Sequence, residues 1–541
     1  MKMRFAKGLF WVQAEYQERM EPLKAGFKWH RGRRLFYSPL PYHAAKLMDH
    51  AVDQETRDRI RAGFEMVEAS QAATSDASIP SIPCPPGLKY FPFQVAGVQF
   101  MQRALAFQGG VLNADEMGIG KTIQTIGVIN AGDYKKILVL CPAIAKLTWL
   151  REMEKWLVDY YTIGVAQGSK WPTETAVVIA NYDIIARNKE AIKATSWDLL
   201  VADECHYLKN PQALRSRTVL GDSDEPGIQA RHKVFLTGTP ILSRPMDIWP
   251  ALNYLTPGMF GSRVKFGLRY CNGYRDGMAW DFSGASNTDE LQYRLRSNVM
   301  IRRLKKDVLK ELPPKIRQIV EIPAAGNAWM QKALKREMAK VQNYRQQVRG
   351  LAHFNEAMAM SDLAQARHET ALAKAPAVVE HLQGIVASGQ KVICFAWHRD
   401  VIETLAKGFT EPAVVTGATS QTARQEAVRR FQEEESCRVF IGNILAAGTN
   451  ITLTAASWVV FAELDWVPGN IKQAEDRAHR IGQTSSVYVQ HLVLEGSIDA
   501  QIARVLLQKQ QIIDGAVNLE SEFIEDEASV LLNLLNSMGE K

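Results

Sequence analysis

Cysteine is scarce in this sequence: there are six among 541 residues, far apart, with no CxxC pair and no histidine at zinc-binding spacing. This pattern argues against a disulfide framework or a zinc module and favours a reducing compartment. Long hydrophobic runs are also missing, since none approaches the ~18 residues of a spanning helix. The N-terminal apolar stretch is interrupted by Lys7 and ends near Gln13, which is too short for a secretory signal. We therefore expect no membrane contact.

A strong excess of one charge sign is missing as well. Lys and Arg number 65 against 58 Asp and Glu, giving a net charge of +7. On so long a chain this excess permits a polyanionic partner without requiring one. The composition is otherwise ordinary for a globular protein, 46% hydrophobic and 23% charged, which excludes wholesale disorder. The length suits roughly three to four domains.

One segment is typical of a linker. Residues 70–87 are rich in Ser, Ala and Pro, and prolines at 80, 83, 85 and 86 would stop a helix or a central strand. The segment separates an N-terminal module, residues 1–69, from a region in which short apolar runs alternate with amphipathic stretches. Near-continuous apolar runs indicate strands that are buried on both faces, as in a parallel α/β sheet. The runs fall in two groups: 135–143, 175–182 and 197–204, then 391–397, 413–417, 438–443 and 457–464.

The two groups of runs predict two α/β lobes. We expect the first lobe over residues 88–300 and the second over 326–518, with a helical insertion at 326–388 in which only Pro376 interrupts the pattern. Between them, residues 301–325 are rich in Lys and Arg, compatible with a helix until LPPK, and predict a basic connector. Residues 519–541 form an acidic, then leucine-rich, tail. A solvated helix face is one interpretation of this tail, and competition with DNA for a basic groove is another.

The first chemical signal is a glycine-rich turn at residues 114–122, ADEMGIGKT, between an apolar stretch and a helix-like run. Such a turn directs backbone N–H groups at phosphates from a helix N-terminus. Lys121 would neutralise phosphate charge, and the Thr122 hydroxyl would bind Mg²⁺. Asp115 stands where the strict pattern has its first glycine. The alternative is a structural turn before a helix.

The second signal is a pair of carboxylates, Asp203 and Glu204, directly after the apolar run LLVA. Adjacent carboxylates at the end of a buried strand are costly unless a cation or a reaction uses them. Asp203 would hold Mg²⁺, and Glu204 would orient the attacking water. Alone, the pair could be an exposed strand end. Its place downstream of a phosphate loop favours the catalytic interpretation.

Two further boxes complete the pattern. LTGTP at 236–240 also ends an apolar run, and the hydroxyls of Thr237 and Thr239 could relay between nucleotide and chain. In QAEDRAHRIGQ, residues 473–483, Arg477 and Arg480 are three apart and share a helix face. A guanidinium supplied across a cleft to a γ-phosphate is an arginine finger. A solvated basic helix is the alternative.

With these boxes in this order, the chain resembles the superfamily 2 helicase-type ATPases, and more narrowly the Swi/Snf family of double-stranded DNA translocases. The resemblance covers roughly residues 88–515, and within the family it points to the annealing-helicase, fork-remodelling branch. The motifs that carry it are FQ (93–94), DEMGIGKT (115–122), DECHYLKN (203–210), LTGTP (236–240), SRP (243–245), RYCNGYRDGMAWDFSGASNTDEL (269–291), RRLKKDVLKELPPK (302–315), GATSQTARQEAVRRFQ (417–432) and FAELDWVPGNIKQAEDRAHRIGQTSSV (461–487).

The resemblance implies an α/β fold with two RecA-like parallel-sheet lobes, helical insertions and a small N-terminal α+β module. ATP with Mg²⁺ would lie in the cleft between the lobes. Gln94 would read the adenine, and His206, Thr237, Thr239 and Gln473 would couple the nucleotide to movement. The expected nucleotide-binding residues are Gln94, Asp115, Glu116, Met117, Gly118, Ile119, Gly120, Lys121 and Thr122. The expected catalytic residues are Lys121, Asp203, Glu204, Arg477 and Arg480, with Thr122 and Asp203 on the metal.

The resemblance also implies an activity. The chain would move along double-stranded DNA by alternating contacts of its two lobes, without conventional strand separation, and would remodel forks, branched DNA or protein–DNA complexes. Contacts mainly to phosphates would make affinity depend steeply on salt. The sequence departs from the family at Cys205, a small residue that the site should tolerate. It also departs at Asn450, where similar proteins have a glycine that a left-handed turn favours.

The N-terminal module mixes aromatic and basic residues. Phe27, Trp29, Phe36 and Tyr37 alternate with Lys28, Arg31, Arg33 and Arg34, and Gly32 suits a hairpin turn between two short strands. This mixture suits a platform that stacks bases and binds phosphates. An equally concrete interpretation puts half of the aromatics in a small core and the arginines on its wet face.

Two other functions stay open from the sequence. One is an RNA-directed helicase of the wider superfamily, and the other is an ATP-gated DNA clamp or recruitment module. We recognise no nuclease, histone-reading or zinc module, which argues against a complete chromatin remodeller. We expect action in the cytoplasm in bacterial or viral DNA metabolism, or in the nucleus of a eukaryote.

Overall fold

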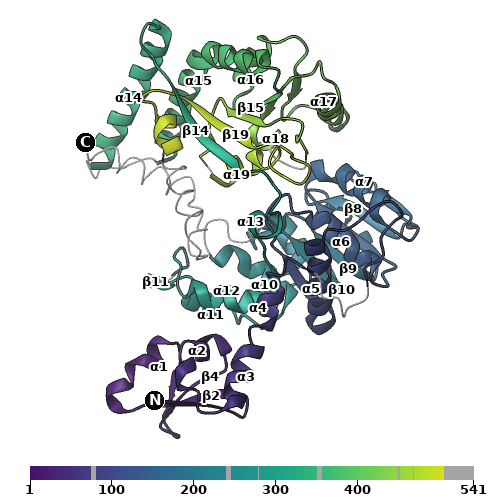
Figure 1. Cartoon of the computed structure of the whole chain (residues 1–541), viewed down its shortest axis with the longest axis vertical. Helices are drawn as coiled ribbons and strands as arrows, with labels where there is room; N and C mark the ends of the chain where they lie inside the picture. Colours follow the sequence, from purple (N-terminus) through teal and green to yellow (C-terminus); the bar gives the residue numbers. More distant parts are fainter. Residues whose placement is uncertain are drawn as a thin grey trace.

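The structure is a computed structural model, and it describes residues 1–74, 81–238, 245–277, 279–349, 356–447, 451–466 and 468–504. Three bodies follow one another along its longest axis: a small N-terminal module, a first α/β lobe and a second α/β lobe (Figure 1). In the described residues, no helix has both the length and the apolar character to cross a bilayer. The Asn450 turn, the 519–541 tail and Thr239 lie outside the described residues.

The N-terminal module is an antiparallel four-stranded sheet in the order β1-β2-β4-β3, packed on short helices. Its inward residues, among them Phe10, Val12, Phe27 and Phe36, form a small separate core. The elements are β1 (Lys2–Ala6), β2 (Leu9–Gln13), α1 (Met20–Lys24), β3 (Lys28–His30), β4 (Leu35–Ser38), α2 (Pro41–Ala45), α3 (Gln54–Ala62) and α4 (Glu65–Ala69). The predicted hairpin is β3–β4, and Phe27 and Phe36 are the aromatics that the core takes.

The first lobe is built on a seven-stranded parallel sheet in the order β13-β5-β10-β9-β6-β8-β7. An antiparallel hairpin, β11–β12, extends from it. The strands are β5 (Gly110–Asn113), β6 (Ile137–Cys141), β7 (Ile163–Val165), β8 (Val177–Asn181), β9 (Trp197–Ala202), β10 (Ala230–Leu236), β11 (Tyr274–Asp276), β12 (Ala279–Asp281) and β13 (Met300–Ile301). The helices are α5 (Pro92–Gln108), α6 (Lys121–Asn130), α7 (Lys146–Trp156), α8 (Lys189–Lys193), α9 (Leu214–Leu220), α10 (Trp249–Leu255), α11 (Arg263–Tyr270) and α12 (Thr288–Arg296).

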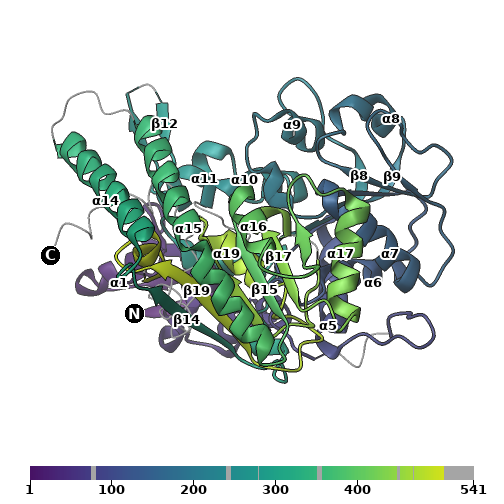
Figure 2. The same cartoon turned by 90° about the horizontal axis from the view of Figure 1, so that it is seen from above.

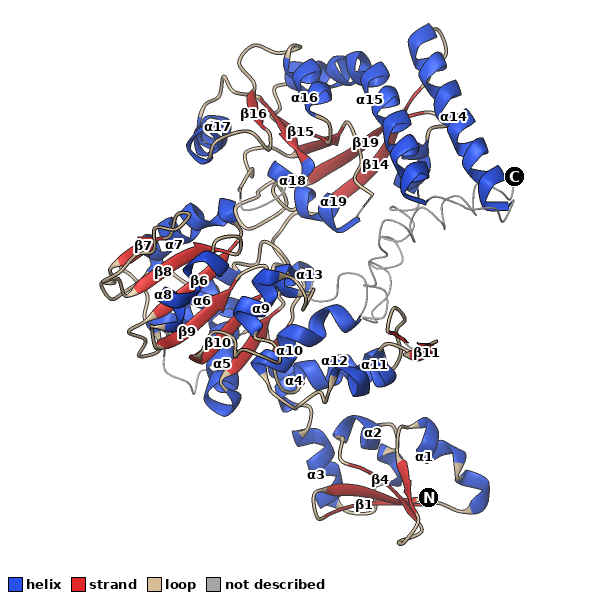
Figure 3. Ribbon diagram, turned by 180° about the vertical axis from the view of Figure 1, so that it is seen from behind, coloured by secondary structure: helices blue, strands red, loops and turns tan. Residues whose placement is uncertain are grey.

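Each central strand of this sheet is apolar on both faces. Along β6, for example, Leu138 and Leu140 join one core cluster while Ile137 and Val139 join the other. Helices cover both faces, as Figure 3 shows with strands in red and helices in blue. This is why the strands read as continuous apolar runs rather than as alternating ones.

The second lobe has a six-stranded parallel sheet in the order β14-β19-β18-β15-β17-β16. It too lies between two core clusters. The strands are β14 (Lys315–Ile322), β15 (Val392–Ala396), β16 (Ala413–Val415), β17 (Val439–Asn443), β18 (Trp458–Phe461) and β19 (Val487–Leu494). The helices are α13 (Lys305–Val308), which precedes the lobe, α14 (Ala328–Arg349), α15 (Glu356–Ala387), α16 (Arg399–Ala406), α17 (Gln421–Glu433), α18 (Ile444–Ala447) and α19 (Pro468–Glu475).

The long helices α14 and α15 lie side by side (Figure 2). They form the predicted helical insertion, but Pro376 lies inside α15 and does not interrupt it. The flanking Ala375 and Val378 are almost fully buried in the core of the lobe. That packing holds the helix together through a residue that usually costs about 3 kcal/mol in a helix interior.

The segment 301–325 differs from the predicted basic connector. Ile301 ends the last strand of the first sheet, and β14 pairs along its whole length with β19 in the second sheet. Only residues 302–314, with the short helix α13, lie between the two sheets. The sequence concealed β14 because KIRQIVEI mixes charged, polar and apolar residues and contains no continuous apolar run. In the structure Lys315 and Arg317 are largely covered by their ion pairs with Glu475, while Ile316 is exposed.

Candidate nucleotide site between two lobes

The phosphate loop joins β5 to α6 at the carboxyl edge of the first sheet. Gly118 and Gly120 have φ values of +84° and +90°, a left-handed conformation that favours glycine. A Cβ on Gly120 would lie 2.6 Å from Gln94 Nε2, so the loop also needs the missing side chain. The helix α6 begins directly at Lys121. Its free N–H groups therefore point into the loop, where an anion would bind.

The Lys121 ammonium folds back onto this loop. Its Nζ donates to the carbonyl of Asp115 at 2.8 Å and lies 3.5 Å from the carbonyl of Glu116. Burial lowers the pKa of Lys121, while the negative charges of Glu204, Asp115 and Asp203 oppose that shift. The ammonium is therefore held by two loop carbonyls in a negatively charged environment, and a bound phosphate could take the place of these carbonyls.

The side chain of Asp115 has a supporting role in the loop. Its carboxylate is fully buried and accepts hydrogen bonds from the backbone N–H and Nε of Arg303, at 2.9 and 3.1 Å, and from Gln124 Nε2 at 3.1 Å. Burial would raise its pKa, but the Arg303 charge and hydrogen bonds hold the pKa below its usual value. The side chain thus ties the loop to the segment after β13. Only the main chain of Asp115 can face a nucleotide.

Asp203 and Glu204 follow β9, which is separated from β5 only by β10. Asp203 Oδ2 accepts from the indole Nε1 of Trp149 at 2.8 Å, and Oδ1 accepts from the N–H of Glu204 at 3.0 Å. Glu204 has a φ of +51°, a strained conformation for a residue with a side chain. Glu204 Oε2 lies 3.2 Å from Nδ1 of His206.

The two carboxyl groups have opposite pKa shifts. Burial, together with the negative charge of Glu204, raises the pKa of Asp203 to about 6. Burial also acts on Glu204, but His206 and the cations Lys121 and Arg477 outweigh it and lower the pKa of Glu204. At neutral pH both groups are ionised, and a divalent cation would relieve the repulsion between them.

The end of β10 brings the third box beside the loop. Thr237 is buried and donates its N–H to the carbonyl of Asn113 on β5 at 3.0 Å. A Cβ on the next residue, Gly238, would lie 2.5 Å from Met117 and 3.5 Å from Lys121 Nζ. The carboxyl ends of β5, β10 and β9 therefore present the loop, Thr237 and Asp203 side by side.

The second lobe contributes the two arginines. A Cβ on Gly118 would lie 2.9 Å from Cβ of Arg480, so this residue reaches the phosphate loop itself. Burial and the neighbouring Arg480 lower the pKa of Arg477 to about 10, although Glu204 opposes the shift. The Nε of Arg477 donates to the carbonyl of Gln473 at 3.2 Å, and Nη1 of Arg480 donates to that of Ile451 at 3.2 Å.

A charge network that the sequence analysis missed holds this arginine segment. Glu475 and Asp476 are buried, and the pKa of each is held low by cations. Lys315 of β14 bridges both carboxylates, at 2.8 Å and 3.1 Å. Lys305, which precedes the second lobe, reaches Asp476 at 2.8 Å and the carbonyl of His479 at 2.7 Å. Its partners lie more than 150 residues away in the sequence, and no local pattern indicates that pairing.

Gln94 contacts the loop at Ile119 and Gly120, close to where Thr122 enters α6. Gln94 is buried near the start of α5, accepts from the N–H of Phe91 at 3.0 Å and donates to the carbonyl of Ile119 at 3.3 Å. Thr122 is the second residue of α6. A magnesium ion fits this donor set, because Mg²⁺ in nucleotide sites uses one or two protein oxygens and completes its shell with phosphates and water. Asp203 and Thr122 supply such oxygens.

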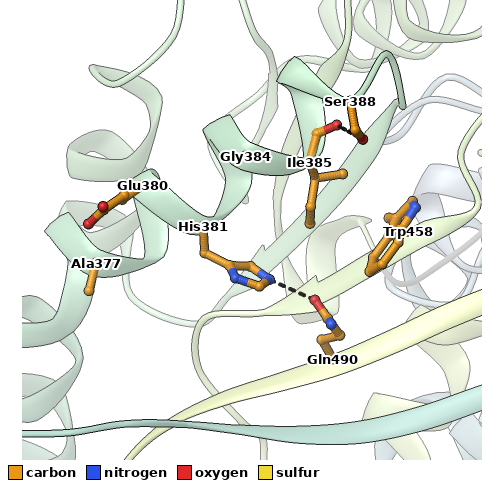
Figure 4. Close-up of a pocket in the computed structure, with 8 residues that line it drawn as sticks. All are labelled: Ala377, Glu380, His381, Gly384, Ile385, Ser388, Trp458 and Gln490. Carbon is orange, nitrogen blue, oxygen red and sulfur yellow. Dashed lines mark hydrogen bonds between the residues drawn. The ribbon is translucent and has the colours of Figure 1, made fainter.

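A separate open pocket of about 580 Å³ lies on the second lobe, where α15 faces β18 and β19. His381 Nε2 and Gln490 Oε1 are 2.7 Å apart in it, and Trp458 forms one wall (Figure 4). None of the expected nucleotide-site residues lines this pocket.

Comparison with protein families identifies the two lobes. The SNF2-related domain matches residues 93–368, which is about half of the chain, and the helicase conserved C-terminal domain matches residues 373–482. The chain belongs to the SNF2-related family. The predicted fold class, two parallel-sheet lobes with a small α+β module, is confirmed.

Individual relatives agree with this family. The SNF2-related chain is 35% identical over 463 residues to the human DNA annealing helicase and endonuclease ZRANB3, a match covering 81% of this chain and 41% of that protein. It is 34% identical over 455 residues to the SWI/SNF-related matrix-associated actin-dependent regulator of chromatin subfamily A-like protein 1 of Xenopus tropicalis, covering 81% and 46%. The chain thus spans less than half the length of these relatives. Among solved structures, the Sulfolobus solfataricus SWI2/SNF2 ATPase core in complex with dsDNA matches at 24% identity and a TM-score of 0.39, covering 82% of this chain and 96% of that one.

Proposed function

We propose that this SNF2-related chain is a DNA-dependent ATPase that moves along double-stranded DNA and remodels forks, branched DNA or protein–DNA complexes. The observation that carries the proposal is the convergence of two lobes on one loop. The loop 115–122 meets Asp203 and Glu204 from the first lobe and Arg480 from the second. A site divided between two bodies changes shape when its ligand is bound or hydrolysed, and that change can drive movement.

Each residue has a chemical part in this proposal. The N–H groups at the start of α6 and the Lys121 ammonium bind the β- and γ-phosphates of ATP. Glu204 orients the attacking water, and its low pKa keeps it ionised for that task. Arg477 and Arg480 approach from the other lobe and stabilise charge on the transferring phosphoryl group. Hydrolysis therefore depends on closure of the lobes.

Mg²⁺ would be held by Asp203 and Thr122. When bound, it neutralises phosphate charge and orients the phosphate chain for in-line attack. Gln94 would contact the base, since its side chain is buried against the loop and donates to the carbonyl of Ile119. His206 and Gln473 contact Glu204 and Arg477, and Thr237 directly follows β10 beside the loop. We therefore expect these three residues to couple nucleotide state to lobe movement.

Family membership supports the proposed DNA substrate. Three matching relatives are named DNA annealing helicase and endonuclease, which supports a motor that restores or remodels duplexes rather than separating strands. Double-stranded or branched DNA is therefore the proposed partner, bound mainly through phosphates. The two competing functions are an RNA-directed helicase and an ATP-gated DNA clamp or recruitment module.

The ATP hydrolysis rate measured against a panel of nucleic acids tests this proposal. The panel holds no DNA, single-stranded DNA, linear duplex, a fork and an RNA duplex, each also with Glu204→Gln. We expect duplex or fork DNA to raise the rate at least tenfold, and Glu204→Gln to remove about two orders of magnitude or more. Glu154→Gln, an exposed carboxylate on α7, is the matched control. Stimulation by RNA alone, or by no nucleic acid, would contradict the proposal.

We also propose that the N-terminal module binds nucleic acid through the outer face of its sheet. Register across the four strands aligns Arg4, Trp11, Tyr37 and Lys28 in one row. The rings of Trp11 and Tyr37 are 5.7 Å apart, and the Arg33 guanidinium lies 4.6 Å from the centre of the Trp11 ring. A row of aromatics with cations at both ends can stack bases and bind phosphates together.

Substituting the central ring tests this surface. Trp11→Ala should weaken binding to a fork with single-stranded arms about tenfold, because stacking contributes about 1–3 kcal/mol per base. The ATPase rate without DNA should not change. Tyr16→Ala removes an exposed aromatic that lies outside the sheet and is the control. Equal affinity of the two variants would show that the sheet face does not bind DNA.

A further inference from the structure

A tryptophan outside the expected site residues contacts the carboxylate that would hold the metal. Trp149 lies on α7, its side chain is almost completely buried, and its indole Nε1 donates to Asp203 Oδ2 at 2.8 Å. The residues are 54 positions apart and come from different elements. The contact is therefore tertiary and is built by the packing of α7 on the sheet.

Three donors together fix this aspartate. Trp149 holds Oδ2, the N–H of Glu204 holds Oδ1 at 3.0 Å, and the Tyr182 hydroxyl donates to the main-chain carbonyl of Asp203 at 2.7 Å. Each carboxylate oxygen accepts one hydrogen bond and keeps a lone pair free. Without the indole, Oδ2 would lose its only side-chain donor among the described residues, and the carboxylate could rotate about its χ2 bond.

We propose that Trp149 is a positioning residue, which orients the Asp203 carboxylate so that its free lone pairs face the cation of a bound Mg²⁺–nucleotide. The inference rests on the proposed function, because it takes Asp203 as the metal ligand. Residues that hold a metal ligand by a hydrogen bond commonly change metal affinity by 10- to 100-fold when replaced. In this assignment Trp149 acts on the nucleotide through Asp203.

The same helix provides a matched control. Trp156 is also on α7 and also buried, and its ring stacks on Tyr90 with centroids 5.1 Å apart. Within the described part of the chain, its Nε1 has no hydrogen-bond partner. Trp149→Phe and Trp156→Phe thus remove the same atoms from one helix, but only the first removes a donor from Asp203.

The experiment is a Mg²⁺ titration of binding of a fluorescent ADP analogue, with full-length protein, alongside melting temperature. For Trp149→Phe we expect the half-saturating Mg²⁺ concentration to rise about tenfold. Binding in excess chelator should not change. Trp156→Phe should stay within twofold of the unsubstituted protein. Replacing Trp149 by benzothienylalanine, which keeps the bicyclic shape and lacks the N–H, should repeat the shift if Trp149→Phe proves too unstable to assay.

Asp203→Asn separates two kinds of failure. In one outcome, Asp203→Asn shifts the half-saturating Mg²⁺ concentration, but the Trp149 and Trp156 variants have equal values. That result would overturn the positioning role and leave Asp203 as the metal ligand. A dependence that Asp203→Asn does not shift would overturn the metal assignment itself, and the positioning role with it. Loss of binding in chelator for Trp149→Phe would mean that the tryptophan only maintains the fold.

Discussion

At the scale of single residues, the site concentrates charge where the protein excludes water. Asp203, Glu204, Lys121 and Arg477 are each shifted in pKa by burial and by one another. Buried charges are costly unless they pair. Strong shifts of this kind, gathered in one cleft, are typical of sites that perform chemistry.

The raised pKa of Asp203 makes a testable contribution to stability. The folded pKa of about 6 exceeds the ordinary value for an aspartate, so folding favours the protonated form. The contribution of Asp203 to folding stability is complete below the pKa of the unfolded state and is lost as the pH rises through 6. Asp203→Asn should therefore raise the melting temperature by about 2–4 °C at pH 7.5, and by much less at pH 4.5. Thermal unfolding of both proteins at the two pH values measures this.

Asp133→Asn is the control for that comparison, because Asp133 is exposed in the same lobe. It should leave the melting temperature unchanged at both pH values. An equal gain for Asp203→Asn at pH 7.5 and pH 4.5 would show that burial does not penalise the charged carboxylate.

At the scale of elements, the site depends on where parallel strands end. β5, β10 and β9 are neighbours, and their carboxyl ends bring the loop, Thr237 and Asp203 together. Polar residues at this edge are the usual ligand site of open α/β sheets. The arginine segment after α19 arrives from the other sheet, and Lys305 and Lys315 hold it through Asp476.

Lys305 gives a prediction about that segment. Lys305→Met should lower kcat for ATP hydrolysis by about tenfold or more, since small displacements of catalytic groups are costly. ATP affinity should change less than kcat, because the Lys305 ammonium pairs with Asp476 and the carbonyl of His479. Only the aliphatic stem of Lys305 lies beside Gly118 of the loop, and methionine keeps such a stem. Steady-state kinetics separate the two effects. Adding Asp476→Asn to Lys305→Met should cost little more.

Lys306→Met is the matched control, since Lys306 is exposed beside Lys305 on α13. It should keep normal kcat. Similar kcat values for the two methionine variants would mean that the cross-lobe ion pair does not position the arginines.

The sequence predicted the elements whose pattern lies within one short segment, and it did not predict contacts between distant segments. The buried strands β6, β8, β9, β15, β17 and β18 were visible as apolar runs, and the loop with its glycines was visible as a motif. The edge strand β14 and the strand β19 were missed, the first because its charged and apolar residues are mixed and form no continuous apolar run. Contacts such as Arg303 with Asp115 and Trp149 with Asp203 join distant segments, and no spacing within one element encodes them.

At the scale of the whole molecule, the N-terminal module is fastened to the first lobe. Tyr293 of α12 donates its hydroxyl to the carbonyl of Gly63 at 2.7 Å, and its ring packs on Tyr42 and Phe64. Nearby, Nε2 of His43 lies 2.9 Å from Oε2 of Glu290 in a buried contact. A nucleic acid bound by the module would therefore be held at a defined place relative to the motor.

Removing that contact should release the module. Tyr293→Ala is expected to speed limited proteolysis between the module and the lobe about tenfold, because cleavage follows the population of the open form. ATPase without DNA should not change. Asp289→Ala, an exposed residue on the same helix, should leave the cleavage rate unchanged. Equal cleavage of both variants would show that this contact does not hold the module.

Movement along duplex DNA is the central claim, and displacement of a third strand tests it most directly. A triplex-forming oligonucleotide is bound to a linear duplex, and its release is followed after ATP is added. We expect ATP-dependent release that Glu204→Gln abolishes, with no separation of the duplex strands themselves. DNA-stimulated ATP hydrolysis without release would indicate a clamp. Separation of strands from an overhang would indicate a conventional helicase, and either result would contradict a duplex translocase.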